Sequence, residues 1–192
     1  EPRAPERSSQ VSEPIFLSLD EVHAIHARSL AEHGGSEGVR DAGLIESALA
    51  SAKNTFYYAN GDLFDVAASY AFHLAESQAF IDGNKRTAVV AAMVFLARNG
   101  VYAQPPRWEL YTAMIDVAEK KKTKADLAEM LAQEIVGNLL AQLREEPSNE
   151  AAIRQRLRVI LSTMRQHVKA DHVHQLARRR LGLTGNSYPE LQ

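Results

Sequence analysis

The stretch ESQAFIDGNKRT, Glu76–Thr87, decides how the rest of the chain is interpreted. It runs from the expected end of one helix through a short turn into the start of the next. A helix start presents unpaired N–H groups and the positive end of the helix dipole, and both attract anions. Gly83 permits a backbone conformation that other residues disfavour and lets a phosphate come close to the chain. The stretch therefore indicates either an anion site between two helices or a plain capped turn with solvated charges.

Charged side chains around this turn suit a nucleotide. Lys85 and Arg86 add positive charge at the helix start, and arginine can hold a phosphate through two parallel hydrogen bonds. Asp82 could hold Mg2+, whose few protein ligands are usually carboxylates. Phe80 is apolar within a polar loop, so we expect it to anchor the turn to the core. The predicted phosphate-binding residues are Asp82, Gly83, Asn84, Lys85 and Arg86, with Asp82 as the metal ligand.

The helices expected around this stretch have recognisable ends. Ser18 and Glu21 match a capping box for a helix over residues 19–32, and Asp41 can cap a second helix that ends at residue 52. A glycine-rich run over 34–38 separates the two. Further helices are expected over 65–78, 85–98, 107–119 and 123–143. Because no strand-rich block appears, the chain is predicted to be all-α, although a short hairpin within 54–63 stays open.

Apolar residues at helical spacing predict which faces are buried. The expected core positions of the first two helices are Val22, Ile25, Ala27, Leu30, Leu44, Ile45, Ala48 and Leu49. The following loop contains Phe56, Tyr57 and Tyr58, which we expect to cover the core rather than to form a mobile flap.

Composition excludes several classes of protein. The chain has no cysteine, which removes disulfides and thiol nucleophiles from consideration. Its longest apolar run, 88–97, is about half of the roughly 20 residues that a membrane span requires, so we expect no membrane partner. The polar first residues do not resemble a secretory signal. A cytoplasmic location is the resulting expectation.

Charge divides the chain near residue 150. Residues 151–192 hold eight Lys/Arg against two acidic residues, a net +6, so the remainder carries −8 of the chain's net −2. We therefore predict a flexible arm over 1–14, a globular domain over 15–145 and a basic helical extension over 146–192. The extension has an apolar stripe at helical spacing, Ile153, Leu157, Ile160, Met164 and Val168. Its arginines could attract nucleic acid, but a solvated face is the more usual role of such charge.

Together these residues resemble the signature of the Fic/Doc (Fido) family, in particular the Doc branch, whose loop reads His-x-Phe-x-Asp-Ala/Gly-Asn-Lys-Arg. The match runs through Gln78, Phe80, Asp82, Gly83, Asn84, Lys85 and Arg86. The segments GVRDAGLIESALASA, FDVAASYAFHLAES and AVVAAMVFLARNGV are also similar to Doc-type segments, in the same order. The resemblance covers residues 15–140.

The resemblance implies a Fido-type helical bundle with a central motif helix pair, whose loop holds ATP with Mg2+. Fic relatives transfer AMP to a hydroxyl of a target protein. The Doc branch has lysine where Fic proteins have a second glycine, as at Lys85, and transfers phosphate to a translation elongation factor. Lys85 and Arg86 would then be catalytic as well as phosphate-binding. A Doc-type toxin also implies an antitoxin partner that covers the active-site groove.

One position departs from the family. Gln78 stands where the family has its general base, a histidine. Histidine takes and returns a proton near neutral pH, whereas a glutamine amide can only orient a hydroxyl. We therefore expect transfer to be impaired by about 10²–10⁴-fold and phosphate binding to remain. His73, five residues earlier, is expected to be a core histidine, not a replacement base. Whether Gln78 is a deliberate inactivating substitution or natural divergence stays open.

Two functions follow from these observations. The first is a Doc-like toxin that transfers phosphate, or AMP, from ATP to a target protein, with impaired activity. The alternative is an inactive Fido-fold module that uses its groove and basic tail to hold a protein or a nucleic acid.

Overall fold

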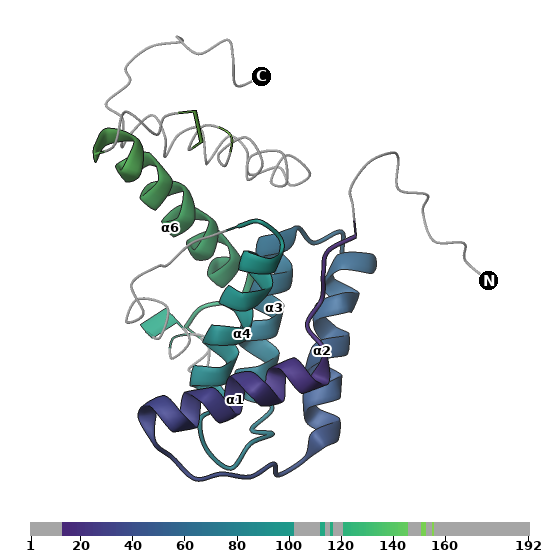
Figure 1. The fold of residues 1–192 in the computed structure, drawn as a ribbon. Helices are drawn as coiled ribbons and strands as arrows, with labels where there is room; N and C mark the ends of the chain where they lie inside the picture. Colours follow the sequence, from purple (N-terminus) through teal and green to yellow (C-terminus); the bar gives the residue numbers. More distant parts are fainter. Residues whose placement is uncertain are drawn as a thin grey trace, which may run out of the picture.

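The fold is known from a computed structural model, which describes residues 13–101, 112, 113, 116, 121–145, 151, 152 and 155. The described elements are α1 (Leu19–His33), α2 (Ala42–Tyr57), α3 (Leu63–Glu76), α4 (Asn84–Arg98) and α6 (Lys124–Glu145), as Figure 1 shows. The only β-type pairing in this part of the chain is an isolated bridge between Val39 and Phe80. The predicted all-α class is confirmed. The apolar stripe and the basic residues predicted for the C-terminal extension lie outside the described residues, and of 107–119 only residues 112, 113 and 116 are described.

α3 is the central element of the bundle and packs against α2, α4 and α6. Nine of its 14 residues are buried. On α4, which packs against α3, the small residues Ala88, Ala91 and Ala92 are fully buried, and such residues let two helices approach closely. α1 crosses the end of the bundle at which α3 ends and α4 begins (Figure 1). This crossing places α1 directly against the turn between the motif helices.

The caps at the starts of α1 and α2 form as the sequence predicts. Ser18 and Glu21 make the reciprocal bonds of a capping box at α1, and the Asp41 carboxylate accepts from the N–H of Gly43 at α2. Thr123 and Asp126 cap α6 in the same reciprocal way. These signals are local, because the side chain that caps a helix lies within a few residues of the N–H that it satisfies.

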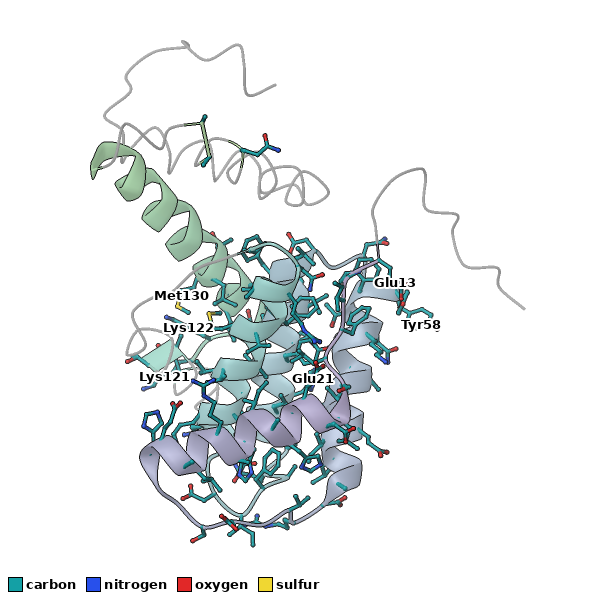
Figure 2. All side chains as sticks on the ribbon, viewed as in Figure 1. Glu13, Glu21, Tyr58, Lys121, Lys122 and Met130 are labelled. Atoms are coloured by element: carbon teal, nitrogen blue, oxygen red, sulfur yellow. The ribbon has the colours of Figure 1, made fainter. Side chains whose placement is uncertain are left out.

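α2 is five residues longer than predicted and reaches Tyr57. The Thr55 hydroxyl contacts the carbonyl oxygen of Ser51 at 3.0 Å and the Ser69 hydroxyl at 3.0 Å, which ties the last turn to α3. Phe56 covers the core as expected, but Tyr58 is 79% exposed and projects from the end of α2 (Figure 2). No hairpin forms within 54–63.

The buried face of α1 differs from the predicted one. Val22 and Leu30 are buried as expected, whereas Ala27 is exposed and His26 and Ser29 are buried in its place. The reason is that α1 faces the polar turn between α3 and α4 as well as the apolar core. On α2, Leu44 also lies farther out than predicted, at 38% exposure.

Among the described residues, no helix is long and apolar enough to span a bilayer.

Candidate functional site

The motif loop, residues 77–83, connects α3 to α4. α3 ends at Glu76, two residues earlier than predicted, and Ser77 is its C-cap. Gln78 has a positive φ of 52°, which takes the backbone out of the helix. Gly83 has a φ of 77° and is the N-cap of α4. The loop therefore contains two left-handed residues, one at each end.

Two buried side chains hold the loop from within. Phe80 is 1% exposed, so the prediction that it anchors the turn to the core is confirmed. The Asn84 side chain accepts from the N–H of Phe80 at 2.9 Å and donates to the Phe80 carbonyl oxygen at 2.8 Å. The Asn84 side chain thus stabilises the loop, and what Asn84 presents at the helix start is its backbone N–H.

A second segment runs alongside the loop. The N–H groups of Arg40 and Asp41 donate to the carbonyl oxygen of Ala79, at 2.7 and 3.2 Å. The N–H of Ile81 donates to the carbonyl oxygen of Gly38 at 3.1 Å. Residues 38–41 therefore hold the backbone of the motif loop from outside, much as a short strand would.

The start of α4 is open. Side chains cap α1, α2 and α3, but no side chain caps α4, whose N-cap is Gly83. The first N–H groups of a helix have no partner within the helix and require one from elsewhere. The positive end of the α4 dipole lies at the same place. This end of α4 is therefore suited to an anion.

Asp82 and Arg86 lie next to this open end. The Asp82 carboxylate accepts from the N–H groups of Gly83 and Ser36, and a guanidinium nitrogen of Arg86 lies 3.6 Å from it. The hydrogen bond from Gly83, followed by that from Ser36 and the charge of Arg86, lowers the pKa of Asp82. The carboxylate is thus ionised at neutral pH. Arg86 also donates to the carbonyl oxygen of Gly34 at 3.0 Å.

The remaining predicted residues have fewer contacts. Lys85 is partly buried and makes no ion pair within the described part of the chain. Gln78 is exposed, and its amide donates to the carbonyl oxygen of Ala75 at 3.3 Å. His73 lies on α3, where burial and then the charge of Lys124 lower its pKa. Because α3 ends before Gln78, the two residues do not share a helix. No group of three potential metal ligands occurs among the described residues.

Sequence reasoning missed His26. Its ring stacks on Phe80, with centroids 3.8 Å apart and planes 10° apart, and its Nε2 lies 3.0 Å from the carbonyl oxygen of Asp82. A signal for it exists, since His26 falls four residues from both Val22 and Leu30 on the buried stripe of α1. The apolar periodicity of this helix predicts only hydrophobic residues on that stripe.

Asn84 offers a test of this geometry. Replacing Asn84 with alanine should lower the free energy of unfolding by about 2–3 kcal/mol, because the buried N–H and C=O of Phe80 both lose their partner. Asn84→Asp keeps an acceptor for the N–H, but its second carboxylate oxygen would face the Phe80 carbonyl oxygen in place of a donor, so it should recover little of this loss. Urea denaturation of both variants measures the difference. Equal stability of Asn84→Ala and the parent would show that the two bonds do not hold the loop.

Comparison with known proteins agrees with the fold and the motif. Residues 16–96 match the Fic/DOC family. The chain is 37% identical over 86 residues to "Protein kinase doc" of Escherichia phage P1, a match that covers 44% of this chain and 68% of that protein. It is 44% identical over 85 residues to "Toxin Doc" of Mycolicibacterium smegmatis, which covers 43% of this chain and 65% of that protein. The chain therefore belongs to the Fic/Doc family. Within the family it is similar to Doc proteins.

Proposed function

We propose that the chain is a Doc-type toxin that binds ATP with Mg2+ at the start of α4 and is built to transfer phosphate to a protein hydroxyl. The observation that carries this proposal is the open, glycine-capped start of α4, with Lys85 and Arg86 in its first turn. No side chain caps the N–H groups of this first turn, and Lys85 makes no ion pair within the described residues. This first turn suits the negative oxygens of a nucleotide.

The residues present also fit Mg2+. Asp82 lies one residue before Gly83, its side chain is 48% exposed, and it is held in the ionised form. Mg2+ commonly takes one or two carboxylates and completes its shell with water and phosphate oxygens, so a single carboxylate beside a phosphate site is sufficient. When bound, Mg2+ would neutralise charge on the phosphates. Lys85 and Arg86 would orient the phosphates from the helix side.

Gln78 limits what the site can do. Its amide oxygen can accept a hydrogen bond from an acceptor hydroxyl and so orient it, but the amide cannot take the proton. The site is thus expected to bind nucleotide and to transfer phosphate slowly. The same feature favours the second candidate, a binding module that has lost transfer and retains nucleotide recognition.

The partners follow from the relatives. A protein named as a toxin is expected to have an antitoxin, which we propose as the partner that covers the site. The relative named as a protein kinase favours phosphate over AMP as the transferred group and a protein, such as a translation elongation factor, as the acceptor. Both proposals concern the whole protein. The matched segments cover 68% of the phage P1 relative and 65% of the Mycolicibacterium smegmatis relative.

Calorimetry with ATP and Mg2+ tests the nucleotide site. Lys85→Gln should weaken binding by about 10- to 100-fold, because one charged contact to a phosphate contributes about 1.5–3 kcal/mol. Lys85 makes no ion pair in the described structure, so its loss should leave the fold intact. Lys53→Gln, which removes an exposed charge from α2, is the matched control and should bind as the parent does. A parent protein that shows no ATP binding would refute the proposed function.

A further inference from the structure

The structure assigns a positioning role to His26: its ring holds the peptide between Asp82 and Gly83, and with it the open start of α4, in one orientation. The consequence for nucleotide binding rests on the function proposed above. The effect of His26 on the conformation of the motif loop does not depend on that function. Three contacts of His26 carry the assignment.

The first contact is a hydrogen bond across 56 residues of sequence. The Nε2 of His26 lies 3.0 Å from the carbonyl oxygen of Asp82, in a part-buried position. Because a carbonyl oxygen can only accept, the Nε2 of His26 must carry the proton. His26 is 6% exposed, so water has little access to its ring. Loss of this bond would therefore leave the buried Nε2–H without a hydrogen-bond partner.

This bond completes the restraint of one peptide group. The Asp82 carbonyl and the Gly83 N–H belong to the same planar peptide. The carbonyl accepts from His26, and the N–H donates to the Asp82 carboxylate. Rotation of the peptide would break both bonds together. Gly83 is thereby kept at its positive φ of 77°, the conformation from which α4 begins.

The other two contacts are of the ring itself. His26 stacks on Phe80 with centroids 3.8 Å apart, which fixes the plane of the imidazole. The ring also fills the space beneath Gly83, since a Cβ on that glycine would lie 3.6 Å from its Nε2. The imidazole thus contacts the loop at Phe80, Asp82 and Gly83.

His23 provides a matched control on the same helix. It lies three residues earlier on α1 and meets Phe80 edge-on, with centroids 6.0 Å apart and planes 89° apart. It is partly buried and makes no hydrogen bond to the motif loop in the described structure. The two histidines therefore differ in the bond to Asp82 while sharing an aromatic neighbour.

The test compares His26→Phe with His23→Phe. Phenylalanine keeps a flat ring against Phe80 and removes the N–H donor. His26→Phe should speed hydrogen exchange at the Gly83 and Thr87 amides of the ligand-free protein by about tenfold, the effect of one lost hydrogen bond on local opening. It should weaken ATP–Mg2+ binding by a similar factor. His23→Phe should change neither.

The outcomes separate this assignment from the proposed function. Exchange that is unchanged in His26→Phe, or changed equally in His23→Phe, would overturn the role of His26. If the parent does not bind ATP, the proposed function fails and the exchange rates alone decide the role of His26. If His26→Phe does not fold, His26→Gln and His26→Ala are compared instead. The glutamine amide can still donate a hydrogen bond to the Asp82 carbonyl oxygen, and alanine cannot. Protection at Gly83 kept by His26→Gln but lost in His26→Ala supports the role, and equal loss in both overturns it.

Discussion

Replacing Gln78 with histidine should raise the rate of phosphate transfer to an acceptor hydroxyl by about 10²–10⁴-fold, the usual contribution of a positioned general base. The backbone can accept the change, because Gln78 has a φ of 52° and histidine is among the residues that tolerate the left-handed region. The side chain is exposed, so the new imidazole would be accessible to an incoming protein. Its pKa near neutrality lets it take the proton that an amide cannot take.

The measurement uses purified protein, ATP, Mg2+ and a translation elongation factor as the acceptor, with mass spectrometry to identify the added group. Addition of AMP in place of phosphate would correct the proposed reaction and keep the proposed site. Gln78→Asn, which retains an amide, should remain at the level of the parent. The phage P1 relative, which is named as a protein kinase, is assayed in parallel to show whether this acceptor can be phosphorylated under the same conditions. If that relative is active and Gln78→His is not, the chain is a binding module and not an impaired transferase.

Local chemistry explains which parts of the fold could be predicted. The caps at Ser18 and Asp41 could be predicted because each involves a side chain and an N–H within three residues. Burial of Phe80 was predictable because a phenylalanine in a polar loop has few other roles. The length of α2 was not, since the bond from Thr55 to Ser69 that ties its last turn to α3 depends on packing.

The shape of the site depends on contacts between distant parts of the chain. The bond from His26 to Asp82 spans 56 residues, and that from Arg86 to Gly34 spans 52. Neither helical periodicity nor motif spacing indicates which residues so far apart in the sequence will form a hydrogen bond. The motif indicated which residue types gather at the start of α4. It did not indicate that the Asn84 side chain stabilises the loop, or that Gln78 lies beyond the end of α3.

This dependence on packing makes Phe80 the residue whose loss should damage the loop most. Phe80→Ala should lower the free energy of unfolding by about 3–5 kcal/mol, the usual effect of truncating a buried phenylalanine. The ring is 1% exposed and stacks on His26, and the Phe80 backbone bonds to Asn84. A loss of this size is a large fraction of the roughly 5–15 kcal/mol that stabilises a typical domain.

Ile81→Ala is the control, because Ile81 is the next residue in the same loop and is 51% exposed. It should lower the free energy of unfolding by no more than about 1 kcal/mol, because only half of this side chain is buried. Urea denaturation at constant pH measures both variants. Similar effects of the two substitutions would mean that the core does not anchor the motif loop. The open start of α4 would then require a bound ligand to hold its shape, and ATP with Mg2+ should stabilise Phe80→Ala and the parent by the same amount, because stabilisation by a ligand depends only on its concentration and affinity.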